Sequence, residues 1–445
     1  MAPEVLETTC CVVGGGPAGV MLGYLLARKG VRVTVLEKHR DFFRDFRGDT
    51  VHPSTLEVLN ELGLLEEFLQ VPHQEVHSAG AIIGDSSFEV ADFRHVPGSC
   101  KFVALMPQWD FLNFLSSHAE KLPGFRLLLE HEATNLVNEG DRITGVVART
   151  GQGEVQIRAD LVVGCDGRHS MTRSDAGLEV IERGVPIDVL WFRISRKPDD
   201  PGQVLGNVNF GKALILINRS EYFQAGLIIQ KGTFYKIKAR GLDEFRETIG
   251  KIAPYLSDRV GEIRDWEQIK ILTVQINRLK RWYRRGLLCI GDAAHAMSPA
   301  GGVGINLAIQ DAVAAANILA EPLREGRVSE ATLAAVQRRR ELPTRITQAM
   351  QAFAHRGFAK VFENPGPIHA PWQMKAALAI PGVHRALGYA VGIGARPEHV
   401  VDDERKRPGR PLRTAAVLAA IATGAVAAAI CWKICKTGNR VSMPA

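Results

Sequence analysis

The sequence predicts an α/β fold with a dinucleotide-binding domain, an inserted antiparallel β-sheet and a helical C-terminal region. The first observation is a glycine-rich turn at residues 14–19, between an apolar β-rich run and an apolar pattern at helical spacing. The second is a pair of later turns, at residues 165–167 and 291–295, each of which follows an apolar strand. The third is residues 181–275, where runs of β-forming residues alternate with Gly, Asn and Asp turns. This order suggests that three distant segments bind one large dinucleotide.

The turn at residues 14–19 has the spacing of a dinucleotide-binding motif. Residues 9–13 form the strand before it, and residues 20–29 carry apolar side chains at helical spacing after it. In G-x-G-x-x-G the first glycine permits the tight turn, the second lets backbone approach a pyrophosphate, and the third lets helix and strand pack closely. The start of the helix adds free N–H groups and the positive end of its dipole. The candidate contacts in this turn are Gly14, Gly16, Pro17, Ala18 and Gly19.

A second strand, residues 31–36, ends at Glu37 and Lys38, about 20 residues after the glycines. An acidic side chain at this place hydrogen-bonds ribose hydroxyls. Strand, helix, second strand and acidic end together complete a Rossmann-like βαβ unit, which a glycine turn alone does not. NAD and FAD both use this motif, so the unit by itself leaves the choice between them open.

Two later segments repeat the design of an apolar strand followed by a polar turn. Residues 160–164 lead into Asp166, and residues 287–290 lead into Gly291 and Asp292. A carboxylate at a strand end accepts hydrogen bonds from sugar hydroxyls, and glycines expose backbone N–H groups that side chains would otherwise cover. A packing turn explains one glycine, but not a Gly-Asp pair, a proline and three more glycines in one short span. The candidate contacts after Asp292 are Pro299, Gly301, Gly302, Gly304, Ile305 and Asn306.

These segments resemble the single-component FAD monooxygenases typified by p-hydroxybenzoate hydroxylase. Residues 166–173 match the D-G-x-x-S-x-x-R element of that family, and residues 291–311 match its flavin-binding stretch almost residue for residue. The resemblance covers residues 7–395 and implies a Rossmann-like FAD-binding domain with FAD as the resident cofactor. It also implies that NADH or NADPH is a transient reductant without a nucleotide domain of its own.

The resemblance implies a role for each candidate contact. It places Asp292 at the ribityl chain, residues 301–306 against the flavin ring and pyrophosphate, and Asp166 where it serves both FAD and NAD(P)H. Arg47 matches an arginine near the flavin phosphates and the nicotinamide cofactor, with a surface arginine of no role as the alternative. Gln108 opens a helix where the family carries an arginine or glutamine that touches FAD. The ADP half is assigned to Gly14, Gly16, Gly19 and Glu37.

No catalytic side chain is assigned from the sequence. His295 follows Gly-Asp-Ala-Ala, and we interpret it as structural because no partner acid or nucleophile stands beside it. The 13 histidines lack the spacing of a metal site, so no metal is predicted.

The motif order divides the chain into four parts. Residues 1–180 form a discontinuous FAD-binding domain with a β insertion near 76–104, and residues 181–275 form a substrate-binding antiparallel sheet. Residues 276–400 return to the FAD domain and add C-terminal helices, including one at 328–354 that Pro343 interrupts. The strands of the sheet are predicted at 185–194, 206–217, 222–229 and 269–278. Candidate pocket residues, whose inward face the alternation leaves open, are Val189, Trp191, Phe192, Phe210, Leu214, Leu216 and Phe223.

Composition narrows the setting of the enzyme. The net charge of +7 is spread over the chain, and we interpret the basic clusters at 278–285 and 338–340 as charged helix faces rather than a nucleic-acid site. Seven dispersed cysteines indicate reduced thiols and a cytoplasmic location. Residues 401–445 are a basic linker followed by the charge-free segment 415–432, half of it alanine. That segment is either an anchor on the cytoplasmic face of a membrane, a peripheral helix or a disordered end.

The resemblance implies a reaction but no particular substrate. NAD(P)H and O2 would hydroxylate a lipophilic aromatic, quinone-like or quinolone-like compound through a flavin C4a-hydroperoxide. The same scaffold also carries epoxidases, ring-rearranging oxygenases and isoprenoid-chain reductases, and a non-catalytic flavin-binding or membrane-scaffold module is a further alternative. The oligomeric state is not specified by the sequence.

Overall fold

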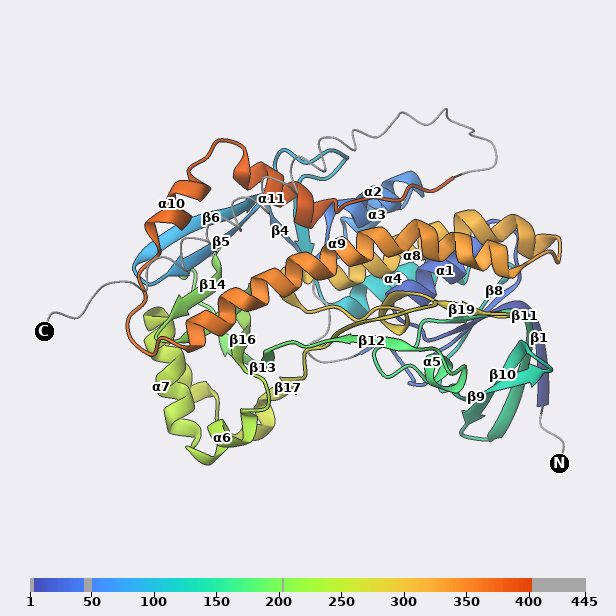
Figure 1. Ribbon diagram of the computed structural model, residues 1–445, viewed down its shortest axis with the longest axis horizontal. Helices are drawn as coiled ribbons and strands as arrows, with labels where there is room; N and C mark the ends of the chain where they lie inside the picture. Colours follow the sequence, from blue (N-terminus) through green and yellow to red (C-terminus); the bar gives the residue numbers. More distant parts are fainter. Residues whose placement is uncertain (1–3, 44–49, 202–203, 402–445) are drawn as a thin grey trace, which may run out of the picture.

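The computed structural model describes residues 4–43, 50–201 and 204–401 of the chain. Two large β-sheets lie at opposite ends of the long axis, and the helix α9 (Glu330–Phe362) runs diagonally along the molecule from one end to the other (Figure 1). Arg47 and residues 402–445, with the predicted segment 415–432, lie outside the described residues.

The first sheet has the parallel core expected of a dinucleotide-binding domain. Its strand order is β19-β20-β11-β1-β2-β8, and β10 and β9 add an antiparallel extension to β11. The neighbours β20, β11, β1, β2 and β8 run parallel to one another, which places their carboxyl ends at one edge. Its strands are β1 (Glu4–Val13), β2 (Val33–Leu36), β8 (Phe125–Leu128), β9 (Glu132–Glu139), β10 (Arg142–Thr150), β11 (Gly153–Gly164), β19 (Tyr283–Arg284) and β20 (Leu287–Cys289).

Three helices pack together beside this sheet. In α1 (Pro17–Arg28) all ten residues from Ala18 to Ala27 are buried, and α1 contacts both α8 (Val303–Arg324) and α4 (Gln108–Ala119). Among the described helices, α8 with its preceding turn is the one long and apolar enough to cross a membrane, at a mean hydropathy of 1.4. Because 72% of that window is buried inside the fold, its apolar character is explained by core packing.

The second sheet has seven strands in the order β17-β13-β16-β15-β14-β5-β6. The predicted strand at 206–217 is two strands, because Phe210 and Gly211 both have positive φ angles of 49° and 67° and form a hairpin turn. The insertion near 76–104 supplies β5 and β6, and β5 pairs parallel with β14, so the sheet is not wholly antiparallel. The strands are β5 (Ser78–Ile83), β6 (Ser86–Asp92), β13 (Ile187–Ser195), β14 (Val204–Asn209), β15 (Lys212–Asn218), β16 (Tyr222–Gln230) and β17 (Lys270–Leu272).

Smaller elements connect the two ends. The predicted strand 269–278 is split, because β17 joins the seven-stranded sheet while β18 (Ile276–Leu279) pairs with β12 (Val180–Arg183). A three-stranded sheet contains β3 (Thr50–Val51), β4 (Gln74–Val76) and β7 (Val103–Leu105). The remaining helices are α2 (Pro53–Glu61), α3 (Leu65–Phe68), α5 (Met171–Asp175), α6 (Phe234–Ala239), α7 (Leu242–Ile252), α10 (Trp372–Leu378) and α11 (Val383–Gly392).

The C-terminal helices differ from the sequence interpretation in two respects. Helix α9 is longer than predicted, with 33 residues, and is assigned as one helix through Pro343. The basic cluster at 278–285 is not on a helix, because it runs from the end of β18 through β19. In the cluster at 338–340, Arg338 is exposed on α9, but Arg340 is fully buried. Arg340 is buried because two carboxylates pair with its guanidinium, as described below.

Candidate functional site

The first glycine turn has backbone contacts that only glycine allows at two of its three motif positions. A Cβ on Gly14, whose φ is +108°, would lie 2.4 Å from the carbonyl oxygen of Cys165. A Cβ on Gly19 would lie 1.9 Å from the carbonyl oxygen of Gly14. A Cβ on Gly16 would have no atom within 4 Å, so this position borders open space at the start of α1. Gly16 is the N-cap of α1 without a side-chain cap, which leaves helix N–H groups for an anion.

Glu37 follows the last residue of β2 and contacts this turn. Its Oε2 accepts a hydrogen bond from the Gly15 N–H at 3.2 Å, and its Oε1 accepts from His39 N at 3.0 Å. The carboxylate is therefore fixed beside the glycine turn, where the motif predicts a ribose contact. Lys38, the next residue, is exposed.

Asp166 shapes the second turn with its own carboxylate. Its Oδ1 accepts from Ser170 Oγ at 2.6 Å and Thr172 Oγ1 at 2.9 Å, and its Oδ2 accepts from Thr172 N at 2.9 Å. These contacts form the turn that begins α5. Gly167, with φ +81° and no atom within 4 Å of an added Cβ, leaves the backbone beside Asp166 open. The side chain therefore holds the turn, and the open backbone at Gly167 is the nearer candidate for a ligand contact.

Arg168 joins the second segment to the third, and the sequence analysis did not single it out. Its Nε donates to Asp292 Oδ2 at 3.1 Å and its Nη2 donates to the carbonyl oxygen of Met297 at 3.3 Å. Its Nη1 is buried and has no hydrogen-bond partner among the described residues. A buried guanidinium N–H without a partner is costly, so this donor suits an anionic or carbonyl group of a ligand. FAD, with its pyrophosphate, fits a site that has both this donor and the open glycine backbone.

The third segment turns sharply at Gly301 and Gly302, whose φ angles are +79° and +63°. A Cβ on Gly302 would lie 2.2 Å from Thr50 Oγ1, whereas a Cβ on Gly301 or Gly304 would meet nothing closer than 3.7 Å. Thr50 Oγ1 also donates to the carbonyl oxygen of Gly302 at 2.8 Å. Gly302 is thus packed against β3, while Gly301 and Gly304 keep their backbone accessible, and Pro299 and Ile305 beside them are partly exposed.

Asn306 ties this segment to the chain around β3 and α2. Its Oδ1 accepts from His52 N at 2.8 Å and from Thr55 Oγ1 at 2.7 Å. Its Nδ2 donates to the carbonyl oxygen of Gly302 at 3.3 Å. The side chain is buried and bonded within the protein, so Asn306 supports the flavin segment rather than presenting its amide to solvent. Gln108 opens α4 as predicted and is partly exposed, beside Trp109, whose ring packs on Phe43 at 4.8 Å.

His295 does have a partner acid, contrary to the sequence interpretation. Its Nε2 lies 2.5 Å from Asp311 Oδ2, which also accepts from Gly291 N at 3.1 Å. Asp311 Oδ1 accepts from Arg340 Nε at 2.9 Å. Burial raises the pKa of Asp311, but the charges and hydrogen bonds of His295 and Arg340 outweigh it and hold this pKa below its ordinary value. All three side chains are 1% exposed or less, so the group supports the Gly291 turn from inside the core.

The two faces of the seven-stranded sheet have different neighbours. One face packs against α7 and contains Phe192, Leu214, Leu216 and Phe223, four of the seven candidate pocket residues. The other contains Val189 and Trp191, and it packs against Phe358 and Phe362 of α9. Ile217 of this second face also packs with β7 and α11. We call it the inner face, because β7 pairs with β3, whose Thr50 bonds Gly302. Phe210 lies in the hairpin turn between β14 and β15.

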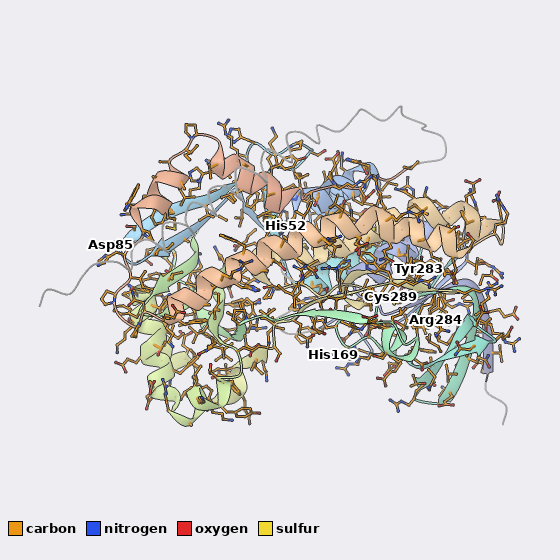
Figure 2. The ribbon with its side chains drawn as sticks, in the orientation of Figure 1. His52, Asp85, His169, Tyr283, Arg284 and Cys289 are labelled. Atoms are coloured by element: carbon orange, nitrogen blue, oxygen red, sulfur yellow. The ribbon has the colours of Figure 1, made fainter. Side chains whose placement is uncertain are left out.

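Figure 2 helps to locate these segments. In that view α9 passes between the labels of His52, which precedes α2, and His169, which is the residue after Arg168 in the chain. Cys289 at the end of β20 lies in the half that contains the parallel sheet. Burial raises the pKa of the Cys289 thiol, and all five described cysteines are free. The described residues contain no group of three or more His, Cys, Asp or Glu that is arranged for a metal ion.

Several supporting residues were missed because their partners are far away in the sequence. Arg168 and Asp292 are 124 residues apart, and Thr50 and Gly302 are 252 apart. The sequence signal that was available is Asp311, a carboxylate in an otherwise apolar helix. A buried carboxylate requires a cation, which pointed to His295 or a distant arginine.

Comparisons with known proteins agree with this geometry. A model of the family described as FAD binding domain matches residues 7–350. The 6-methylpretetramide 4-monooxygenase of Streptomyces rimosus is 32% identical over 84% of this chain and 89% of that protein. Dialkyldecalin synthase of Streptomyces rugosporus is 28% identical over 69% of this chain, which spans 64% of that relative's length.

A solved structure shows the same fold. The anhydrotetracycline hydroxylase OxyS of Streptomyces rimosus has a TM-score of 0.69 and 21% identity, with 87% of this chain and 76% of that chain covered. The predicted fold class, the family resemblance and FAD as cofactor are thereby confirmed. The chain belongs to the FAD-binding-domain family and is a FAD-dependent monooxygenase of the p-hydroxybenzoate hydroxylase type.

Proposed function

We propose that the enzyme inserts one oxygen atom of O2 into an electron-rich, lipophilic aromatic compound with NADH or NADPH as reductant. One substrate C–H becomes C–OH, the second oxygen atom leaves as water, and NAD(P)H gives up a hydride that, with one proton, balances it. The observation that carries the proposal is the apolar inner face of the seven-stranded sheet, which is linked through β7 and β3 to the open backbone at Gly301 and Gly304. An apolar surface beside a cofactor segment suits an aromatic substrate and keeps water away.

The residues that would hold FAD come from all three segments. The Gly16 backbone and the start of α1 would bind the pyrophosphate, Glu37 the ribose, Asp292 the ribityl chain, and the backbone of 299–304 the flavin ring. Bound FAD supplies the hydride acceptance and oxygen activation that side chains lack. Arg47 and Gln108 remain proposed contacts on the resemblance, as do Lys38 and Asp166.

Arg168 and Asp292 would orient the cofactor between the second and third segments. The Arg168 guanidinium binds Asp292, the same carboxylate that is proposed to bind the ribityl hydroxyls. Its Nη1, which has no partner among the described residues, would add a further hydrogen-bond donor to the site. A fixed positive charge here would favour a negatively charged reduced cofactor. Arg168→Gln should therefore weaken FAD binding and lower the flavin reduction potential.

The substrate class follows the names of the relatives. The S. rimosus relative is named for 6-methylpretetramide, and we propose a fused-ring phenolic substrate of similar kind for this enzyme. The partly exposed Ile215 and Ile217 on the apolar inner face suit a flat ring system. Quinone-like and quinolone-like aromatics are the next compounds to try.

The test is a substrate screen with isotopic oxygen. The purified yellow protein is mixed with NADH or NADPH and candidate aromatics, and the product made under 18O2 is analysed by mass spectrometry. One 18O atom in the product and substrate-stimulated NAD(P)H consumption are expected. Dialkyldecalin synthase, by its name, makes rings rather than adding oxygen, so conversion that continues without O2 would replace our proposal with a cyclase or reductase.

We further propose a cytoplasmic enzyme whose residues 415–432 attach it to the inner membrane surface. The support is the charge-free run itself, with basic residues before it and Lys433 after it. Membrane fractionation compares the full chain with a chain ending at residue 404. Equal recovery of both in the soluble fraction would contradict the attachment.

A further inference from the structure

Helix α9 carries a row of buried polar side chains on one face. Arg340, Thr344, Gln348, Gln351 and His355 are each 5% exposed or less, and their spacing of three or four residues aligns them. Burying polar groups costs free energy unless each is hydrogen-bonded. Their partners therefore indicate what this face holds.

Gln351 binds the backbone of the third glycine-rich segment with its whole amide. Its Oε1 accepts from Ser298 N at 3.1 Å, and its Nε2 donates to the carbonyl oxygens of Ser298 at 2.9 Å and Ala300 at 3.0 Å. Gln348 extends this pattern, because its Nε2 donates to the carbonyl oxygen of Ala296 at 3.3 Å. The backbone of Ser298 and Ala300 is thus bonded to α9, whereas Ala296 is bonded both to α9 and to Asn277 of β18.

His355 adds a side-chain contact one turn further along α9. Burial lowers the pKa of His355 to about 4, so its ring is neutral near pH 7 and one nitrogen is an acceptor. Ser298 Oγ accepts from Ala300 N at 3.2 Å and lies 2.8 Å from His355 Nε2. Ser298 Oγ and His355 Nε2 therefore share a hydrogen bond, and the Ser298 oxygen fixes the turn into Gly301.

The same helix then reaches the other sheet. Phe358 and Phe362 pack on the inner face with Val189 and Trp191. Within two turns, α9 thus contacts both the segment before Gly301 and the sheet face where the substrate is proposed to bind.

We propose that Gln351 and His355 are positioning residues: they set the place of backbone 298–302 against the flavin and so fix the flavin relative to the inner face of the sheet. The inference deepens the proposed function and rests on it for the coupling of reductant to product. A small displacement of the reacting groups is enough to cost a large factor in rate, about 100-fold per ångström. Misplaced cofactor would consume NAD(P)H and O2 and release hydrogen peroxide instead of hydroxylating.

The experiment compares Gln351→Leu and His355→Phe with a matched control on the same helix. Gln337 also binds backbone with its amide, since Oε1 accepts from Trp282 N at 3.0 Å and Nε2 donates to the carbonyl oxygen of Lys280 at 3.0 Å. Gln337→Leu removes the same kind of contact away from Ser298. For each holoenzyme we would measure the Kd for FAD, the visible spectrum and midpoint potential of the flavin, and hydrogen peroxide released per NAD(P)H oxidised.

We expect Gln351→Leu and His355→Phe to raise the Kd for FAD about tenfold. They should also shift the spectrum and potential and raise the hydrogen peroxide fraction several-fold. Gln337→Leu should lower thermal stability without these changes. Identical FAD affinity, spectrum and peroxide fraction in Gln351→Leu and Gln337→Leu would overturn the proposal. Failure of the proposed function can be distinguished from failure of this inference. The FAD affinity and the flavin spectrum test the positioning role even if no substrate stimulates the wild-type enzyme.

A double-mutant cycle tests whether His355 acts through Ser298. Ser298→Ala removes the hydroxyl that is hydrogen-bonded to His355, and Ser298→Ala with His355→Phe removes both groups. If the two residues act as one unit, the double variant has the same shift in flavin potential as Ser298→Ala alone. Additive shifts would place the effect of His355 elsewhere. Gln351→Glu, which keeps the side-chain shape, serves if Gln351→Leu does not fold.

Discussion

The two large sheets differ in how their functional contacts are encoded. At the parallel sheet, the functional contacts depend on residues within one short segment. Gly14 and Gly19 lie where a Cβ would clash with a backbone oxygen, and the spacing of these glycines in the sequence indicates this. In the seven-stranded sheet one face is buried against α7, and the other is covered in part by α9 and β7. Strand alternation is the same for both faces. Close contacts between backbone segments can therefore be predicted from local motifs, whereas the packing partner of a strand face depends on elements that are distant in the sequence.

The largest expected effect separates two glycines of the same motif. Gly19→Ala puts a Cβ 1.9 Å from the carbonyl oxygen of Gly14, which forces α1 away from the turn. We expect little folded, FAD-containing protein, with a loss above about 3 kcal/mol in the free energy of unfolding. Gly16→Ala meets nothing within 4 Å, so it should fold normally but weaken FAD binding. Urea unfolding of the apoprotein and FAD titration measure the two quantities, and equal stability of both variants would contradict this division.

The second prediction concerns the buried ionic group behind the Gly291 turn. Asp311→Asn keeps the shape but removes the charge that pairs with His295 and Arg340. Removing one partner of a buried pair should lower the free energy of unfolding by roughly 3–5 kcal/mol. The control is Asp141→Asn, which breaks an exposed pair with Arg285 and should cost at most about 1 kcal/mol. Similar losses in both variants, measured by urea unfolding, would show that the group at Asp311 is not a structural centre.

The third prediction compares neighbours on opposite faces of β15. Leu216, 1% exposed, packs toward α7, and Leu216→Ala should cost roughly 2–5 kcal/mol while leaving substrate preference unchanged. Ile217 is partly exposed on the inner face, so Ile217→Ala should cost less than about 2 kcal/mol but raise KM for the aromatic substrate. Thermal unfolding and steady-state kinetics decide between them. A KM effect in Leu216→Ala and none in Ile217→Ala would mean that the substrate lies on the α7 side.

The sequence predicted most of the cofactor half and little of the substrate half. The βαβ unit, Glu37 and the Gly291–Asp292 turn were all recognisable, because each depends on residues within one short segment. The faces of Phe192 and Trp191 were not, since α7 and α9 decide them from 50 and more residues away. The insertion near 76–104 was recognised as β structure, but its pairing with β14 depends on a parallel register that local sequence does not report.

Buried polar groups were missed for a related reason. The sequence predicted that Arg338 to Arg340 form a solvent-exposed helix face. Arg340 is nevertheless fully buried, because Asp311 and Glu398 both bind its guanidinium. His295 looked isolated because its acid stands 16 residues later, on α8. A charge in an apolar helix is thus a better indicator of a distant partner than of a solvated face.

The smallest expected effect lies where the two regions meet. His52 precedes α2, is 1% exposed, and donates from Nδ1 to the carbonyl oxygen of Val391 at 2.8 Å, on the α11 helix that packs against β6. Burial lowers the pKa of His52 to about 4, and the Val391 bond opposes this only in part.

The pH dependence follows from that shift. The unfolded state, with a pKa near 6.5, binds the proton first as pH falls, so stability is present above about pH 6.5 and declines toward pH 4. Between pH 7 and pH 5 the wild-type protein should lose about 2 kcal/mol more than His52→Asn, which can keep the donor to Val391 but does not titrate. Urea unfolding of both proteins at the two pH values measures the difference. Equal losses would mean that His52 is protonated in the folded protein at pH 5, and that the junction between the FAD side and the seven-stranded sheet is open enough to solvate its charge.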